Sequence, residues 1–396
     1  MPGFRQLHPL DWLAVGLLAA GGACVAAGWL PASDAGDVVV RIAELLGFLA
    51  SVIVLAELTA EAEVFDVIAA WVAAVGRGSY LALFLLCVGF ASLTTITLNL
   101  DTTAVLLTPV MLVLAAKVGL APLPLAVTTA WLANTASLLL PVSNLTNLLA
   151  LDRIGLDPAA FAARMWAAQL ASIVVTMVFL WVFYWRRGER GVDRYTPPGS
   201  HLPRDRMLFA VAAAACLLFI TAILLVDAPL WVASLICAVV VVAAFARRRP
   251  QSLRLSLVPW RLLAFVTGLF LVIGALSRHG LAELMLWLVG DDDGVLGGYR
   301  AAAAGAGLSN VVNNLPAYVA GEAVVPEANH DQLLALLVGT NVGPVVTPWA
   351  SLATLLWYER CHAYGVQVPL GKLMLTGAGL AVVGLAATVA ALMLTG

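Results

Sequence analysis

Long apolar segments separated by short polar loops run along almost the whole chain. Nine of these segments are long enough to cross a bilayer as helices. They lie near residues 11–30, 38–57, 124–150, 164–185, 206–227, 229–246, 259–277, 331–357 and 369–394. We expect the first to be a retained membrane helix, because it is longer than the apolar region of a signal peptide. The pattern predicts an all-α polytopic membrane protein with about nine or ten crossings.

Two further apolar regions, 79–117 and about 296–325, are interrupted by polar tips at Asn99 to Thr103 and at Ser309 to Pro316. We interpret each as a re-entrant hairpin that enters and leaves on the same side of the membrane. Non-helical backbone at membrane depth is tolerated only where protein or water satisfies its polar groups. The two tips should therefore lie inside the molecule.

The windows 124–150 and 331–357 both contain polar residues and prolines where a crossing helix should be continuous. Asn134 and Pro141 are separated by seven residues, as are Asn341 and Pro348, and the two pairs are offset by 207 residues. Proline removes a backbone donor and breaks a helix. Broken helices at matching places in two halves are typical of inverted-repeat transporters, which bind solute at mid-membrane.

These features divide the sequence into a first repeat at 1–186, a linker at 187–205 and a second repeat at 206–396. The linker and the Arg247 to Arg254 loop are the most basic connections, and basic loops favour the cytoplasm. Counting crossings from them puts the N-terminus inside. The first hairpin then opens from the cytoplasm and the second from the exterior.

Composition supports a membrane protein and excludes several other classes. Hydrophobic residues make up 62% of the 396 residues and charged residues 11%, against about 25% charged in soluble domains. A net charge of -2 without a basic stripe gives no reason to expect nucleic acid as a partner. The five cysteines have neither metal-ligand nor disulfide spacing: Cys24, Cys87, Cys216, Cys237 and Cys361. We expect no metal site and no cofactor.

Asp101 stands alone between Tyr80 and Ala116, a stretch with no other acidic or basic residue. A charge at membrane depth is costly, so an acid there is a candidate functional group. We expect Asp101 to couple transport to a proton or cation. The alternative is that it only caps the returning arm of the hairpin.

Neutral polar residues gather around the tips and breaks of both halves, and they form the candidate solute site. Single Ser, Thr or Asn residues in membrane helices usually serve helix packing, whereas clusters at helix breaks favour a binding site. Amides, hydroxyls and helix N-termini suit oxyanions or hydroxylated solutes, and freed carbonyls suit cations. The substrate-binding candidates are Asn99, Thr102, Thr103, Asn134, Thr135, Ser143, Asn144, Asn310, Asn313, Asn314, Asn341, Thr347 and Ser351. Ser137, Asn147, Thr340 and Thr354 line the same segments.

Four of these motifs resemble those of the bacterial arsenite/antimonite efflux permeases, in the same order and over nearly the whole chain. The segments Leu98–Pro109 and Ser309–Pro316 resemble the two hairpins of that family. Asn134–Asn147 and Gly343–Trp357 resemble its two broken helices. The family belongs to a wider ion-transporter group that includes Na⁺-coupled dicarboxylate carriers and Na⁺/H⁺ antiporters.

The resemblance implies export of arsenite and antimonite as neutral trihydroxides, driven by inward proton movement across the bacterial inner membrane. It also implies a transport domain that moves against a scaffold, a homodimer, and in some members a soluble ATPase partner. The chain departs from the family in two ways. Its first half has one crossing fewer, and Asn134 and Asn341 stand where some members have Asp.

The sequence leaves four other functions to weigh. A Na⁺-coupled carrier of a small organic anion, or a Na⁺/H⁺ antiporter, would use the same fold. A membrane-embedded enzyme is disfavoured, because no His-Asp, Cys-His or paired-carboxylate constellation lies at membrane depth. A channel is disfavoured by the proline-broken repeats.

Overall fold

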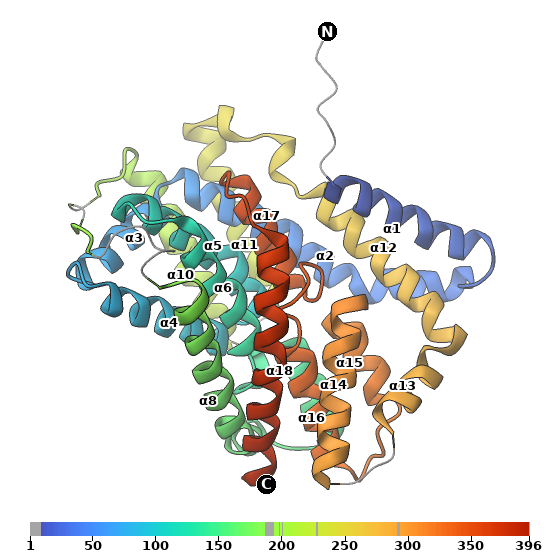
Figure 1. The fold of residues 1–396 in the computed structure, drawn as a ribbon. Coiled ribbons are helices and arrows are strands. Elements are labelled where there is room, and N and C mark those ends of the chain that lie inside the picture. The colour runs from blue at the N-terminus through green and yellow to red at the C-terminus, as the bar shows by residue number, and fades with distance from the viewer. Residues whose placement is uncertain are drawn as a thin grey trace. The chain divides into compact units, whose positions relative to one another are not determined.

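The apolar segments form helices throughout the computed structural model (Figure 1). A helix pairs its backbone groups within one segment, which is what a lipid environment demands. The structure describes residues 9–186, 194–197, 199, 201–226, 229–290 and 294–395. Among these residues no strand forms beyond an isolated bridge between Ser79 and Arg194. The prediction of an all-α protein is confirmed.

Seven helices in the described part of the chain are long and apolar enough to cross a membrane. Five match windows expected to cross, and the other two are the arms of the first hairpin. The spans are Ile42–Glu61, Tyr80–Thr97, Leu100–Val118, Pro158–Phe183, Leu230–Arg248, Trp260–Leu281 and Leu370–Leu394. The chain is therefore a multi-pass membrane protein. Two other expected windows contain shorter apolar helices, Ala14–Ala26 and Arg206–Ala222.

The chain divides into two compact units, and each unit takes segments from both halves of the sequence. Unit 1 comprises Met1–Ala62 and Asp205–Glu283, and unit 2 comprises Glu63–Arg204 and Leu284–Gly396. The proposed linker at 187–205 lies partly outside the described residues, which omit 187–193, 198 and 200. The compact units therefore do not coincide with the two sequence repeats.

Unit 1 is built from helices that pack through small residues. A Cβ atom added at Gly268 of α12 would overlap the backbone at Leu18 of α1, so these two helices approach closely. Helix α2 packs against α10, α11 and α12. The elements of unit 1 are α1 (Pro9–Ala26), α2 (Ala32–Glu61), α10 (Arg206–Val226), α11 (Leu230–Arg248), η2 (Pro250–Ser252), η3 (Leu255–Leu257), α12 (Trp260–Leu276) and η4 (Ser277–Leu281).

Unit 2 contains both hairpins and both broken windows. Each hairpin is two helices joined by a short polar tip, and each broken window is two helices separated by irregular backbone. Its elements are α3 (Val64–Val75), α4 (Tyr80–Thr97), α5 (Leu100–Val118), α6 (Pro122–Thr135), η1 (Pro141–Ser143), α7 (Leu145–Ile154), α8 (Pro158–Phe183), α14 (Gly294–Val312), α15 (Asn314–Glu322), α16 (His330–Val342), α17 (Leu352–Ala363) and α18 (Leu370–Leu394). Helix α13 (Ala282–Val289) begins at the boundary between the units.

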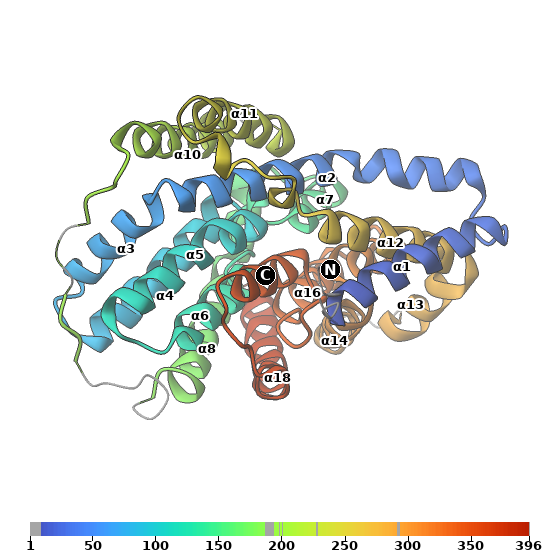
Figure 2. The same cartoon turned by 90° about the horizontal axis from the view of Figure 1, so that it is seen from above.

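The two halves of unit 2 exchange partners in a reciprocal way. Helices α4 and α5 pack with α6 (Figure 2), and α14 and α15 pack with α16. Helix α17 crosses over to pack on α5 and α6, while α7 packs on α15 and α16. Helices α8 and α18 pack against each other. The second part of each broken window thus contacts the hairpin of the other half.

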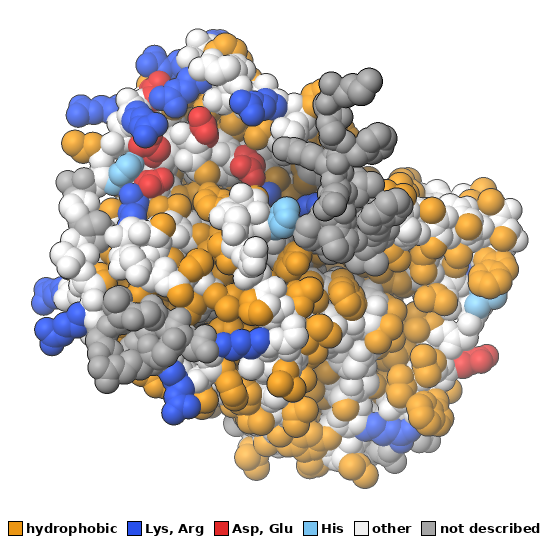
Figure 3. Space-filling view, turned by 45° about the horizontal axis from the view of Figure 1, so that its top comes forward, with side chains coloured by type: hydrophobic (Ala, Val, Ile, Leu, Met, Phe, Trp, Pro, Cys, Tyr) orange, Lys and Arg blue, Asp and Glu red, His pale blue; other side chains and the backbone are white. Residues whose placement is uncertain are grey.

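Many large apolar side chains are exposed at the surface, and the interior of unit 2 contains buried polar side chains among its apolar ones. Leu93 of α4, Val178 of α8 and Leu375 of α18 are at least half exposed. Hydrophobic side chains cover much of the described part of the face drawn in Figure 3. By contrast, Thr103, Thr128 and other hydroxyl residues are fully buried. This arrangement suits a protein that has lipid as its outer solvent.

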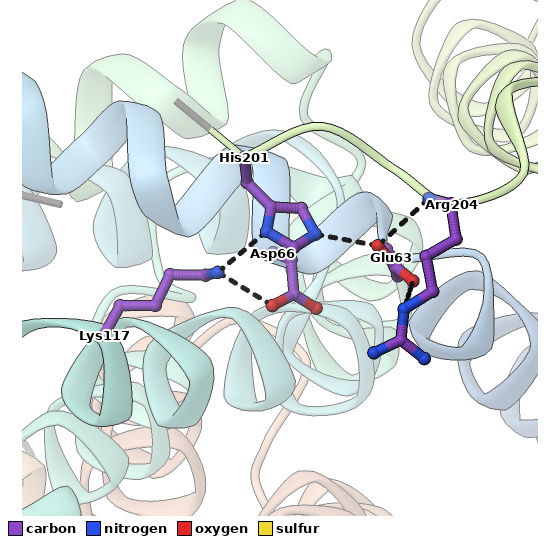
Figure 4. A network of polar contacts seen from close by, with 5 residues as sticks. All are labelled: Glu63, Asp66, Lys117, His201 and Arg204. Atoms are coloured by element: carbon purple, nitrogen blue, oxygen red, sulfur yellow. Dashed lines mark hydrogen bonds and ion pairs between the residues drawn. The ribbon is translucent and has the colours of Figure 1, made fainter. Parts of the chain in front are cut away.

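One end of unit 2 is held by a chain of charged side chains (Figure 4). Lys117 Nζ lies 2.9 Å from Asp66 Oδ1 and 3.4 Å from His201 Nδ1. His201 Nε2 lies 2.8 Å from Glu63 Oε2, and Arg204 Nε lies 3.5 Å from Glu63 Oε1. These contacts place the start of α3, the end of α5 and residues 201–204 at one face, as the count of crossings expects.

A second set of contacts joins segments that the count of crossings places at the opposite face of the membrane. Arg164 donates to Leu392 O and lies 2.8 Å from Asp331. Arg153 lies 3.1 Å from Glu327. The end of α7 therefore lies by the loop after α15, and the first turns of α8 lie by the start of α16 and the end of α18.

The contact between α14 and α16 depends on glycine. A Cβ atom at Gly339 would overlap the carbonyl of Ala302, and one at Gly343 would overlap Ala306. We predict that Gly339→Val lowers the free energy of unfolding by about 1–3 kcal/mol through overpacking. The measurement is the thermal midpoint in detergent. Gly89→Val is the matched control, because Gly89 of α4 has nothing within 4 Å. Equal midpoints for the two variants would contradict the packing account.

Candidate functional site

Two helices of unit 2 stop inside the unit and resume after about nine residues of irregular backbone. Helix α6 ends at Thr135 and α7 begins at Leu145. Helix α16 ends at Val342 and α17 begins at Leu352. Pro141 lies in the first gap, and Pro344 and Pro348 lie in the second, where they cannot donate to a helical ladder. Each gap leaves backbone groups that need partners from elsewhere.

In the first gap, the partner is the side chain of Gln169 on α8. Its Oε1 accepts hydrogen bonds from the backbone N–H groups of Leu138 at 2.7 Å and Leu139 at 3.1 Å. Its Nε2 donates to Thr135 O at 2.9 Å, and Ser172 donates to the same oxygen. Gln169 is 3% exposed, so its amide replaces the lost helical bonds away from water.

The two gaps meet at Asn341, the residue just before the end of α16. Its Oδ1 accepts hydrogen bonds from Asn144 Nδ2 and from the Thr146 hydroxyl, both at 2.9 Å. Its Nδ2 donates to Asn147 Oδ1 at 2.8 Å and to Ser137 O at 3.5 Å. All four partners belong to the first half of the sequence. Asn341 therefore joins the two halves through every polar atom of its side chain.

A second link between the halves runs through Asn134. Its Nδ2 donates to Thr354 Oγ1 at 2.9 Å and to Ala130 O at 2.9 Å. The Thr354 hydroxyl also contacts Ser351 Oγ at 2.9 Å and Pro344 O at 3.2 Å. Asn134 and Asn341, which occupy matching places in the sequence, thus each bind the other half.

The hairpin tips share an unusual backbone conformation. Asn99 has φ 148° and Asn313 has φ 94°, and each is the N-cap residue of the returning arm. Asparagine is one of the few side chains that tolerates positive φ. Asn99 Oδ1 accepts from the Thr102 N–H at 2.7 Å, whereas Asn313 donates instead to Trp349 O at 3.0 Å.

Each tip is tied to the gap of its own half. Ser143 donates to Ile96 O at 2.8 Å, which joins the first gap to the first hairpin. Asn310 donates to Gly343 O at 2.9 Å and accepts from the Thr347 N–H at 3.0 Å. The indole N–H of Trp349 donates to Asn310 O at 2.9 Å. The four polar motifs therefore form one connected hydrogen-bond network within unit 2.

Helix N-termini also converge on this network. Asn144 and Ser351 cap α7 and α17 by accepting from the backbone N–H groups of Thr146 and Thr354. The N-termini of α5 and α15 begin at the hairpin tips. A helix N-terminus carries a partial positive charge and stabilises nearby oxygen atoms of a ligand.

Three buried oxygen atoms near the tips and gaps have no hydrogen-bond partner among the described residues. They are Asp101 Oδ1, Thr102 Oγ1 and Asn134 Oδ1. A buried polar atom without a partner is costly. Most of the amides described above are fully used in holding the structure, so these oxygen atoms are the ones available to a hydroxylated solute or a cation.

Three of the predicted site residues do not take part in the contacts between the two gaps. Thr135 faces α8, where its Oγ1 accepts from the Thr176 hydroxyl at 2.9 Å. The Thr103 hydroxyl bonds Asn99 O at 2.8 Å within its own hairpin. Asn314 is buried as the first residue of α15. Thr135 and Thr103 bond groups of neighbouring helices or of their own hairpin, whereas Asn134, Asn144 and Asn341 connect the gaps.

Sequence reasoning missed the polar face of α8 and the role of Trp349. Gln169, Ser172 and Thr176 recur every three or four residues in an apolar helix, which would have indicated one polar face. Arg360, which lies beyond the expected window 331–357, is part of α17 and is 7% exposed. The described residues contain no cluster of His, Cys, Asp or Glu that could hold a metal ion.

Comparison with known proteins gives a consistent family. The citrate transporter (CitMHS) family model matches residues 9–354. An arsenical pump membrane protein of Escherichia coli is 29% identical over 349 residues, covering 81% of this chain and 78% of that protein. A putative arsenical pump membrane protein of Bacillus subtilis is 26% identical, covering 77% and 78%. The predicted similarity to arsenite permeases is confirmed.

Two further matches are more distant. A 46 kDa membrane protein of Mycobacterium leprae is 25% identical, and the match covers 87% of this chain and 84% of that protein. Among solved structures, the YdaH transporter of Alcanivorax borkumensis covers 97% of both chains with 14% identity and a TM-score of 0.45.

A double-mutant cycle tests the bond between the two gaps. We predict that Asn144→Ala and Asn341→Ala together destabilise the protein by less than the sum of their separate effects. The coupling energy should be about 0.5–2 kcal/mol, because the two amides bond each other. Thermal unfolding in detergent measures it. Ser309, which bonds only within α14 in the described structure, gives the control pair Ser309→Ala and Asn144→Ala. Additive effects for Asn144 and Asn341 would contradict the contact.

Proposed function

The chain belongs to the citrate transporter family, and we propose that it is a secondary active transporter that exports arsenite and antimonite as neutral trihydroxides in exchange for protons. Membership of this family and the multi-pass fold establish a membrane transporter. The cargo follows from relatives whose names describe arsenical pumps. The coupling ion follows from the chemistry of the site.

The observation that carries the proposal is the single network that joins both tips and both gaps. It contains amides, hydroxyls, carbonyls and helix N-termini. A trihydroxide offers three O–H donors and three oxygen acceptors without charge, so it needs hydrogen-bond partners and no counter-ion. The unpartnered oxygen atoms of Thr102 and Asn134 can accept its hydroxyls, and helix N-termini can face its oxygens.

Asp101 is the residue that we assign to the proton. It lies in the first turn of α5, and its Oδ1 is buried without a hydrogen-bond partner among the described residues. The described ion pairs do not include it. A carboxyl group can carry a proton in one direction and release it in the other, and an intramembrane acid is a functional candidate by default. Proton binding and solute binding at one tip would then compete.

We infer that unit 2 moves as the transport domain and unit 1 serves as the scaffold. The network lies wholly within unit 2, so hairpins and broken helices can move together without breaking it. Alternating access in inverted-repeat transporters is largely rigid-body movement of one bundle against another. Each hairpin would form part of a gate. We further propose the bacterial inner membrane, a homodimer, and an optional soluble ATPase partner.

A second function remains a serious candidate because the matching family is named for citrate. A Na⁺-coupled organic anion carrier would use the freed carbonyls for Na⁺ and the helix N-termini for carboxylates. A Na⁺/H⁺ antiporter would use Asp101 for both ions. Dependence of transport on Na⁺, with no effect of arsenite, would favour these alternatives over the export of trihydroxides.

The proton assignment is tested with inverted membrane vesicles. We predict that Asp101→Asn abolishes arsenite accumulation driven by a proton gradient, because an amide cannot exchange a proton. Exchange of arsenite between equal concentrations on both sides should continue. Asp152→Asn is the control, because Asp152 is an exposed residue near the end of α7. Accumulation at the wild-type rate in Asp101→Asn would leave Asp101 as a helix cap only.

The orientation is tested with impermeant thiol reagents in intact cells. In a cysteine-free background, we predict that Glu327→Cys is labelled and Leu202→Cys is protected. Both side chains are well exposed, at 82% for the Glu327 side chain and 73% for Leu202. They lie at the two different faces defined by the charged contacts. Labelling of Leu202→Cys with protection of Glu327→Cys would reverse the topology.

A further inference from the structure

The connection between α11 and α12 in unit 1 is an ordered segment. It contains two short turns, η2 and η3, between Arg249 and Trp260. The Ser252 hydroxyl donates to Glu61 Oε1 at 3.4 Å, and η3 packs against α2. The Trp260 indole N–H donates to Leu255 O at 3.2 Å. These contacts hold the segment in a defined shape against the end of α2.

Basic residues dominate this end of unit 1. Asp205 is paired with Arg248 at 2.9 Å, and this hydrogen bond lowers the pKa of the Asp205 carboxyl. The charges of Asp205 and Arg248 cancel, so the other arginines outnumber the remaining acidic residues at this end of unit 1. The basic residues are Arg206, Arg247, Arg248, Arg249, Arg254 and Arg261, and the acidic residues are Glu57, Glu61 and Asp205.

Large apolar side chains are exposed among these arginines. Leu255 is 82% exposed, Trp260 is 61% exposed and Met207 is 53% exposed. Leu255 directly follows Arg254, which is also exposed. Tryptophan with exposed leucine and arginine is typical of the level at which lipid headgroups meet the hydrocarbon.

We propose that this basic surface of unit 1, formed by Arg206, Arg247, Arg249, Arg254, Leu255 and Trp260, binds the headgroups of anionic phospholipids. Excess arginine attracts phosphate, and the contacts of Ser252 and Trp260 hold the segment that carries Arg254. Leu255 and Trp260 reach the acyl region beside the headgroups. A soluble phosphate would satisfy the arginines and leave these apolar side chains in water, so a lipid fits better.

This binding has a mechanical consequence for a transporter whose other unit moves. Lipid bound along the α11–α12 connection would stabilise unit 1 at the membrane interface, independently of the solute. The effect therefore does not depend on which solute is carried, and it can be measured without any transport assay.

The test is thermal unfolding of the full-length protein in detergent, titrated with phosphatidylglycerol or phosphatidylcholine. We expect phosphatidylglycerol to raise the thermal midpoint at much lower concentration than phosphatidylcholine. Each arginine near a membrane surface contributes about fivefold in binding. Arg249→Gln with Arg254→Gln should therefore raise the half-saturating concentration of phosphatidylglycerol about 25-fold. Arg248 is left intact because it pairs with Asp205.

Controls separate a lipid site from general effects of charge. Arg153→Gln with Arg186→Gln removes the same charge from unit 2 and should leave the titration unchanged. Glycerol phosphate, which has the headgroup charge without acyl chains, should not raise the midpoint. Leu255→Asn should weaken the response to phosphatidylglycerol. Equal responses to the two lipids, an unchanged titration in the Arg249 and Arg254 variant, or an equal effect of glycerol phosphate would overturn the proposal.

Discussion

The structure depends on one constraint, which is that interrupted backbone inside a membrane protein must find hydrogen-bond partners other than water. Both gaps in unit 2 would be costly without such partners. In the first gap, Gln169 accepts a hydrogen bond from the backbone N–H of Leu138. In the second gap, Asn310 donates to the carbonyl of Gly343 and Thr354 donates to the carbonyl of Pro344. Helix ends and freed carbonyls can therefore lie in the interior because side chains satisfy their hydrogen bonds.

The same requirement explains why the halves are interleaved. Asn341 is satisfied entirely by groups of the first half, and Asn134 bonds Thr354 of the second. Helices α7 and α17 pack on the opposite hairpins, which brings these side chains into reach. Neither half could complete its own network. The hairpins and gaps are thereby joined into a single unit, which is a suitable body to carry a solute site.

Much of this organisation could be predicted from the sequence, because helix breaks have a local chemical signature. Proline with asparagine at equal spacing located both gaps, and the isolated Asp101 located a hairpin tip. The bonding partners could not be predicted. Asn144 and Asn341 are 197 residues apart, and only the packing of α7 on α16 brings them together.

Some single residues also depend on tertiary context. Successive side chains of a helix point about 100° apart, so Asn134 contacts Thr354 of α17 while Thr135 contacts Thr176 of α8. No local pattern shows which neighbour each of them meets. Arg360 is buried because α17 continues to Ala363 and packs on α5. Sequence reasoning therefore located the polar segments, whereas the division between structural amides and available oxygen atoms required the structure.

The most direct test of the central claim is an electrical one on the purified wild-type protein. Exchange of a neutral solute for a proton moves net charge, so proteoliposomes on a solid-supported membrane should give a current when arsenite is added. The account predicts this current in buffer without Na⁺, at equal pH on both sides. A current that requires Na⁺ and appears with citrate but not with arsenite would contradict it.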